Sequence, residues 1–241
     1  MKVLGIETSG NVGGVAVCED KHIILAKEFG GMQHGKELVL TIKDVLGEVG
    51  WKPRDIDLIA VDVGPGSYTG LRVGVACAKT MAYALNKPVI DVPIFDIIAE
   101  NYTVNTTPIC PVLDAKRNHV YACIYKPVNV SDIQGQSGFE PVTERIQWKR
   151  LTEFMVIQPD KLLSILPRPV IIFGDGVLPY KDVFQQKDIF IDKEERAIPK
   201  VEYVALLGEK MYESGHRCEI EKLLPLYLRR AEAIEKLESK K

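Results

Sequence analysis

One stretch of the chain, Asp57 to Leu85, constrains the fold more than any other. It reads DLIAVDVGPGSYTGLRVGVACAKTMAYAL. The apolar, β-branched run Leu58–Val63 predicts a buried strand, which Gly64-Pro65-Gly66 interrupts. From Leu71 to Leu85 the residues are good helix formers, and none is proline. A buried strand that leads at once into a helix indicates an α/β protein.

The predicted helix has two sides that are both poor in charge. One side is a wholly apolar stripe at helical spacing, made of Leu71, Gly74, Val75, Ala78, Met81, Ala82 and Leu85. The other side carries only Arg72 and Lys79 as charges and is otherwise filled by Val73, Ala76, Cys77, Thr80, Tyr83 and Ala84. Small residues let a second helix approach closely. This side therefore predicts a contact with another part of the chain or with another protein.

A glycine turn between a strand and a helix suits several kinds of site. A Walker phosphate loop would need Lys-Ser or Lys-Thr after its last glycine, where Leu71-Arg72 stands. The dinucleotide fingerprint is nearer, but the glycines read GxGxxxG, which is one residue too many. A serine-hydrolase elbow would need glycines at the positions of Pro65 and Thr69 around Ser67. The pattern favours a tight strand-to-helix connection with a capping hydroxyl, and anion binding is the second reading.

Composition narrows the class of protein. A chain of 241 residues suits one large or two small domains, and 46% hydrophobic residues are ordinary for a globular protein. The formal net charge of -2 gives no general attraction to nucleic acid, so any RNA contact must be local or supplied by a partner. No stretch approaches the length of a membrane span, and the five cysteines show no CxxC spacing. We therefore expect a cytoplasmic protein with reduced thiols.

The chain divides into two similar halves. The first predicts a three-stranded meander over Val3–Phe29, then a helix over Lys36–Val49, the glycine block and a strand at Val89–Val92. In the helix, Leu40 lies opposite a buried face formed by Leu38, Val39, Ile42, Val45, Leu46 and Val49.

The second half begins near Thr107. There the run Ile109–Leu113 ends at Asp114, much as Val3–Ile6 ends at Glu7. After it we predict a strand at Val120–Tyr125, a polar excursion at Lys126–Gly138, and helices after Asp160, Gly176 and Pro199. We expect an N-terminal subdomain at 1–106 and a smaller, degenerate C-terminal subdomain with a tail at 107–241. Two βββαβα halves with an acid at each first turn are typical of the actin/Hsp70/sugar-kinase-like (RNase H-like) fold.

Several segments together resemble the bacterial TsaB (YeaZ) family in order and spacing. They are Ile6-Glu7-Thr8-Ser9, His34 before an amphipathic helix, GPGSYTGLRVG with Ala78-Lys79, DAKRNHVYACIY from Asp114, and PLYLR from Pro225. The GPGSYTGLR block is the most specific of them, and Glu7 stands where the family usually has Asp. TsaB looks like a degenerate relative of TsaD, the subunit associated with transfer of a threonylcarbamoyl group to the adenosine beside the anticodon of certain tRNAs.

The resemblance implies a non-catalytic subunit that binds and supports TsaD. The ATPase TsaE would join a larger complex, tRNA would be met only through that complex, and the chain alone could form a homodimer. No cofactor and no metal are expected. The resemblance also places the partner on the two helices of the first half. The expected partner-binding residues are Leu40, Arg72, Val73, Ala76, Cys77, Lys79, Thr80 and Ala84.

Two enzyme functions are the alternatives. TsaD-like proteins, long called glycoproteases, carry a metal-binding HxxxH pair just after the glycine block, but Ile94 and Ile98 fall at those positions here. Isoleucine cannot ligate a metal, which argues against a metal-dependent glycoprotease. A kinase-like enzyme would need strand-end acids and glycine turns around a nucleotide. Fragments of such a vestigial nucleotide site are Glu7, Thr8, Ser9, Gly64, Gly66 and Asp114.

Overall fold

The computed structural model describes residues 1–30, 34–103, 106–128 and 147–228. Contacts divide the chain into two units, each built on its own sheet. The first comprises Met1–Ile97 with Pro199–Leu226, and the second is built on Ile98–Ile198. Residues 199–226, which the sequence pattern placed in the C-terminal subdomain, thus pack in the first unit.

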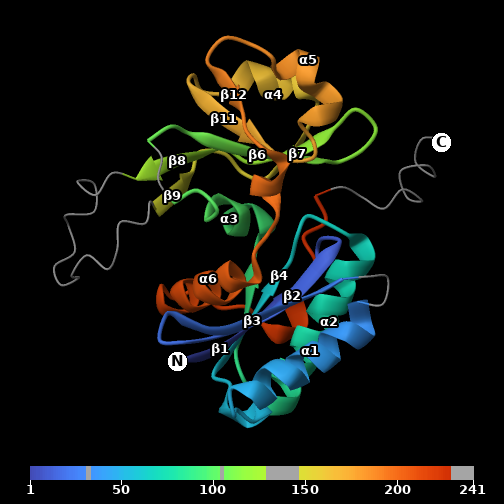
Figure 1. The fold of residues 1–241 in the computed structure, drawn as a ribbon, viewed down its shortest axis with the longest axis vertical. Coiled ribbons are helices and arrows are strands. Elements are labelled where there is room, and N and C mark those ends of the chain that lie inside the picture. The colour runs from blue at the N-terminus through green and yellow to red at the C-terminus, as the bar shows by residue number, and fades with distance from the viewer. Residues whose placement is uncertain (31–33, 104–105, 129–146, 229–241) are drawn as a thin grey trace. The chain divides into compact units, whose positions relative to one another are not determined.

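The first unit contains a five-stranded sheet (Figure 1). Its strands, in spatial order, are β3 (His22–Gly30), β2 (Val12–Glu19), β1 (Lys2–Glu7), β4 (Leu58–Asp62) and β5 (Val89–Val92). Strand β1 runs antiparallel to β2 and parallel to β4. The two neighbours of β1 therefore belong to the predicted meander and to the glycine block.

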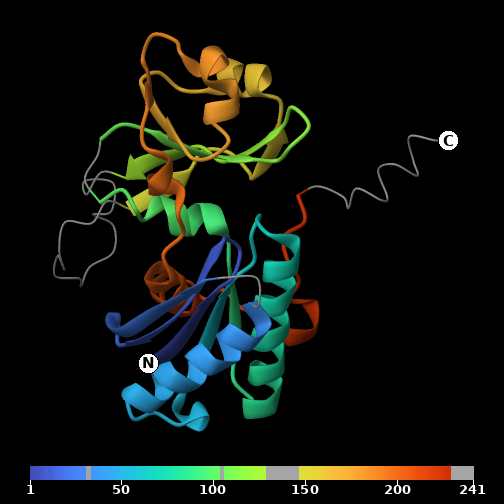
Figure 2. The same ribbon diagram turned by 45° about the vertical axis from the view of Figure 1, so that its right-hand side comes forward.

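Helices cover both faces of this sheet. Helices α1 (His34–Glu48) and α2 (Tyr68–Leu85) share an apolar core on one face, and α6 (Val201–Glu213) packs on the other (Figures 1 and 2). Helix α6 lies very close to the strands because small residues meet there. A Cβ at Gly208 would lie 2.3 Å from Cβ of Ala60, and one at Gly5 would lie 2.9 Å from N of Ala205. This fit of small residues explains why α6 belongs to the first unit.

The second unit repeats the topology of the first. Its main strands, in order, are β10 (Met155–Ile157), β7 (Val120–Ala122), β6 (Ile109–Asp114), β11 (Val170–Phe173) and β12 (Ile189–Ile191). Strand β6 is antiparallel to β7 and parallel to β11, as β1 is to β2 and β4. The internal repeat predicted from the two acidic strand turns is confirmed, as are the two separate sheets of the actin-like fold.

The helices of the second unit are short. Helix α4 (Pro159–Ile165) and helix α5 (Lys181–Phe184) contribute Leu162 and Phe184 to its core. The predicted strand Val120–Tyr125 is divided, since β7 pairs with β10 while β8 (Tyr125–Val128) pairs with β9 (Gln147–Arg150). Helix α3 (Ile94–Ala99) was not predicted. Most of the predicted excursion, 129–138, lies outside the described residues.

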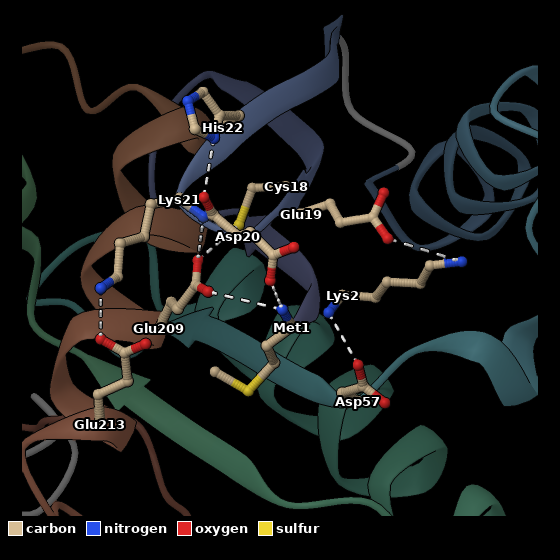
Figure 3. A network of polar contacts seen from close by, with 10 residues as sticks. All are labelled: Met1, Lys2, Cys18, Glu19, Asp20, Lys21, His22, Asp57, Glu209 and Glu213. Carbon is tan, nitrogen blue, oxygen red and sulfur yellow. Dashed lines mark hydrogen bonds and ion pairs between the residues drawn. The ribbon is translucent and has the colours of Figure 1, made fainter.

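A buried carboxylate fixes α6 to the β2–β3 turn (Figure 3). Glu209 is 1% exposed, and its Oε2 accepts a hydrogen bond from the backbone N–H of Lys21 at 2.9 Å. The same oxygen lies 3.5 Å from the thiol of Cys18, and Oε1 lies 4.0 Å from the ammonium of Met1. That ammonium is also bound by Asp20 at the turn. The carboxylate therefore joins one helix to two strands.

We expect Glu209→Ala to lower the free energy of unfolding by about 3 kcal/mol, since breaking a buried charged contact leaves donors without an acceptor. Glu209→Gln keeps the shape and one acceptor oxygen, so its loss should be about 1 kcal/mol. Chemical denaturation of the three proteins at pH 7 measures both values. Equal losses for the two variants would show that the carboxylate makes no specific contribution.

Candidate functional site

The turn after β1 is closed by its own side chains. Oε1 of Glu7 accepts hydrogen bonds from the backbone N–H and the hydroxyl of Ser9, at 2.5 and 2.6 Å. The hydroxyl of Thr8 donates to the carbonyl of Gly70 on α2, at 2.8 Å. All three residues of the turn are buried. The hydroxyls of Thr8 and Ser9 and one oxygen of Glu7 are therefore bonded within this turn or to α2.

The glycine turn uses its backbone donors internally. The N–H of Gly64 donates to Oδ1 of Asp62 at 2.7 Å, and that of Ser67 donates to the carbonyl of Ser9 at 2.7 Å. The hydroxyl of Ser67 caps α2 by accepting from the N–H of Gly70 at 3.2 Å. The predicted strand-to-helix connection with a capping hydroxyl is confirmed. An anion at this helix N-terminus would have to displace these bonds.

Tight packing explains the glycines after the turn. A Cβ at Gly70 would lie 2.0 Å from the carbonyl oxygen of Thr8, and one at Gly74 would lie 2.2 Å from the hydroxyl of Thr8. Gly64 has φ +92°, a left-handed conformation that favours glycine. The GPGSYTGLRVG block thus holds the first turns of α2 against the end of β1.

Glu7 and Asp62 form a pair of buried carboxyl groups at the ends of the parallel strands β1 and β4. Burial raises the pKa of Glu7 well above its ordinary value, and the neighbouring Asp62 raises it further. Burial also raises the pKa of Asp62, against hydrogen bonds from its neighbours that lower it. The pair is therefore unsuited to carry two negative charges.

Asp114 occupies the equivalent place in the second unit. Its Oδ1 accepts from the N–H of Lys116 at 2.7 Å, as Glu7 accepts from Ser9, and Lys116 Nζ lies 2.5 Å from Oδ2. Its own N–H donates to Oδ1 of Asp175 at 2.9 Å. The predicted nucleotide-site residues thus divide between the units: Asp114 lies in the second, and the rest lie at two adjacent turns of the first, after β1 and after β4. That they bind a nucleotide stays a prediction.

The positions that would hold a metal in TsaD-like proteins are part of the apolar core. Ile94 is 4% exposed and Ile98 is fully buried. Within the described residues, no group of three or more His, Cys, Asp or Glu side chains is arranged to hold a metal ion. The same described part of the chain contains no helix with the length and apolarity needed to cross a bilayer.

The outer side of α2 is exposed and mostly uncharged. Ala76, Thr80 and Ala84 face solvent, and Tyr83 is 78% exposed. The hydroxyl of Thr80 donates to the carbonyl of Ala76 at 2.8 Å, so the helix itself satisfies this polar group. Arg72 lies over the ring of Tyr68, 4.0 Å from its centroid. We call Ala76, Thr80, Tyr83 and Ala84, with Val39 of α1, the docking face.

One flank of α2 is covered by a segment of the first unit. Lys79 Nζ donates to the carbonyls of Glu221 and Leu223, at 3.0 and 3.2 Å. Val73 and Cys77 are partly buried against the core of the unit. Lys79 is one of the residues expected to bind a partner, and its ammonium binds residues 221 and 223 of its own chain. No local pattern could predict this contact, because Lys79 and Glu221 lie 142 residues apart.

The exposed side of α1 contains one residue that was predicted to be buried. Val39 is 59% exposed, and Leu40 is 45% exposed. A Cβ at Gly35 would lie 3.9 Å from Val73 of α2, and Val39 is one turn further along the same flank. The prediction that Val39 lies in the core is wrong. Val39 is exposed on the surface of α1, as is Leu40, which was predicted to lie outside the buried face.

Comparison with known proteins identifies the family. The family model of TsaD, described as tRNA N6-adenosine threonylcarbamoyltransferase, matches residues 19–237. The chain belongs to the TsaD family, in its TsaB (YeaZ) branch.

Full-length relatives define this branch. The "tRNA threonylcarbamoyladenosine biosynthesis protein TsaB" of Bacillus subtilis is 29% identical, and both chains are covered completely. The protein of the same name from Escherichia coli is 24% identical, again over all of both chains. The solved structure of YeaZ from Pseudomonas aeruginosa matches with a TM-score of 0.75 at 22% identity, covering 94% of this chain and 100% of that one. The resemblance to TsaB that the motifs predicted is confirmed.

Proposed function

We propose that this TsaB-family chain is a non-catalytic subunit for threonylcarbamoyl modification of the adenosine beside the anticodon of tRNA, and that it acts by binding and supporting TsaD. The exposed, uncharged docking face is the observation that carries this proposal. The full-length relatives of the chain are named as biosynthesis proteins of threonylcarbamoyladenosine in tRNA. The other observation that bears on the proposal is the turn after β1, where Glu7 and Ser9 are hydrogen-bonded to each other.

The closed turn supports a role without catalysis. A nucleotide site of this fold needs free acids and free backbone donors at the strand ends. Here one oxygen of Glu7 is bonded to Ser9, and one oxygen of Asp62 is bonded to the backbone N–H of Gly64. A metalloprotease would need imidazoles where Ile94 and Ile98 lie in the core. Neither enzyme alternative gains support from a specific contact.

The docking face supports binding of a helical partner. Small side chains allow a second pair of helices to approach α1 and α2 closely, and Val39 and Tyr83 add apolar area. Arg72, which is exposed at the end of this face, would influence the choice of partner more than the affinity. Leu40 would lie at its other edge. Of the residues proposed from the sequence, Lys79 is committed to its own chain and Val73 and Cys77 are half-buried.

The same face would serve both associations that we propose. A homodimer would form when the chain is alone, and TsaD would replace the second copy. TsaE would join through the complex, and tRNA would be contacted indirectly in the cytoplasm. Because both partners would use the same face, TsaD and a second copy of the chain should compete for it.

Purified chain mixed with TsaD from the same organism tests the proposal. On size-exclusion chromatography with light scattering, we expect a complex of one chain with one TsaD and loss of any homodimer. Addition of TsaD to a homodimer carrying a fluorescent pair on its two copies should remove energy transfer. A complex that forms while energy transfer persists would show that the two partners use different surfaces.

A further inference from the structure

The buried carboxyl groups of Glu7 and Asp62 have more acceptor oxygens than there are hydrogen-bond donors in the described part of the chain around them. Oε1 of Glu7 accepts two hydrogen bonds from Ser9, and Oδ1 of Asp62 accepts one from Gly64. The other two oxygens, Oε2 of Glu7 and Oδ2 of Asp62, have no donor among the described residues. The two carboxyl groups lie next to each other at the ends of the paired strands β1 and β4, where Ile6 lies beside Val61. Two ionised carboxylates cannot satisfy that contact, because neither has a hydrogen to donate.

We propose that Glu7 and Asp62 share one proton, which bridges their two unpartnered oxygens as an acid–carboxylate pair. Like charges in contact and out of water cannot both persist, and one proton gives each oxygen a partner. The proton removes one charge from a site that is 1% exposed at Glu7 and fully buried at Asp62. A metal ion is the less suitable bridge, because the site offers only these two carboxyl groups.

Among the described residues, no charged group besides the two carboxyls is a cause of the raised pKa values of Glu7 and Asp62, and β5 places Val92 beside Asp62. Strand β2 presents Gly14 opposite Glu7, and α2 presents Gly70 and Gly74 to Thr8. Helix α6 reaches this end of the sheet through Val201, which packs on Gly14. Glu7 and Asp62 are therefore the titratable groups that face one another here, and Ser9 and Gly64 supply neutral donors.

The shared proton goes beyond the proposed role in binding TsaD and does not depend on it. Asp62 accepts from Gly64 at the start of the turn that leads to α2. Loss of the proton would place two charges beneath that turn. The stability of the first unit should therefore depend on pH through this pair.

The direction of the pH dependence follows from proton binding. In the unfolded chain, Glu and Asp have pKa values of about 4.3 and 3.9, so both lose their protons above about pH 5. The folded pair, whose pKa values are raised, keeps one proton there. Stability is complete below the unfolded pKa values and falls as pH rises toward the folded pKa. In that window the unfolding constant rises about tenfold per pH unit.

Glu7→Gln provides the test, because its amide can accept from Ser9 and donate to Asp62 with nearly the same shape. We expect the ratio of unfolding constants, wild type to variant, to rise about tenfold per pH unit above pH 5. At pH 7, unfolding of the wild type in weak buffer should release about one proton more than unfolding of the variant. Parallel pH profiles with equal proton release would overturn the proposal.

Two further measurements test the shared proton directly and test whether a cation occupies the site in its place. Carbon-13 NMR of wild-type chain labelled at Asp and Glu carboxyls needs no variant. It should show, at pH 7, a carboxyl signal with the shift of a protonated acid, and its absence would refute the shared proton. Titration with Mg²⁺ or Mn²⁺ should leave the melting temperature unchanged. A rise that occurs in the wild type and not in Glu7→Gln would assign the site to a cation instead.

Discussion

Gly70→Ala should lower the free energy of unfolding by about 2–3 kcal/mol, because its new methyl group would overlap the backbone of the β1 turn. The Cβ would lie 2.0 Å from the carbonyl oxygen of Thr8, which cannot rotate away as a side chain would. Helix α2 would have to move, and its hydrogen bond from Thr8 to Gly70 would be strained. The expected fall in melting temperature is about 5–10 °C.

Gly47→Ala is the matched control, and we expect it to raise the free energy of unfolding slightly instead of lowering it. Gly47 is exposed on α1, and a Cβ there meets no atom within 4 Å. Alanine favours helix over glycine by about 0.5–1 kcal/mol, so this variant should be slightly more stable than the wild type. Thermal unfolding of both variants by circular dichroism gives the comparison. A Gly70→Ala protein as stable as Gly47→Ala would contradict the close contact between α2 and the β1 turn.

Ala76→Glu should weaken association with TsaD by about a hundredfold or more. Forcing an unpaired charge into a buried helix contact costs about 3 kcal/mol or more. In the free chain Ala76 is exposed, so the variant should keep its own stability within about 0.5 kcal/mol. Titration calorimetry with TsaD measures the affinity, and thermal unfolding measures the stability. The homodimer, if formed, should be lost in the same variant.

Ser164→Glu is the control for charge. Ser164 is exposed on α4 of the second unit, and the substitution adds the same single negative charge. It should leave the affinity for TsaD unchanged. If Ala76→Glu remains folded and binds TsaD as the wild type does, the partner binds elsewhere. Equal weakening by both substitutions would point to a general charge effect and not to the docking face.

Much of the first unit could be predicted from local sequence because its signals are strong and close together. The apolar run Leu58–Val63, the glycine turn and the charge-poor helix after it predicted β4, the Ser67 cap and α2. The repeated strand and acid at Glu7 and Asp114 predicted two sheets of the same topology. Each of these signals is contained in a stretch of about one strand and one turn, and the repeat is the recurrence of one such stretch in the second half.

Features that depend on distant contacts could not be predicted in this way. The sequence pattern places helix α6 with the C-terminal half. Its observed position in the first unit depends on the fit of Gly208 against Ala60, and these residues are far apart in the sequence. The hydrogen bonds of Lys79 to Glu221 and Leu223 likewise join segments that are far apart in the sequence. Val39 falls at the edge of the apolar stripe, where helical periodicity does not decide between core and surface.

The buried pair shows the same limit at the candidate site. The sequence pattern predicts Glu7 as a strand-end acid, but it does not single out Asp62 within the run Leu58–Val63. The parallel pairing of β1 with β4, in which Ile6 lies beside Val61, brings the two carboxyl groups together. Pairing of two strands across more than fifty residues leaves no local pattern in the sequence.

Reconstitution of the tRNA modification tests the central claim most directly. TsaD with TsaE, tRNA and the threonylcarbamoyl donor should form threonylcarbamoyladenosine efficiently only when this chain is added, and Ala76→Glu should fail to replace it. The chain without TsaD should form none, since we propose that it supports TsaD and does no chemistry. Product formed by this chain alone, or by TsaD at the same rate with and without it, would contradict the account.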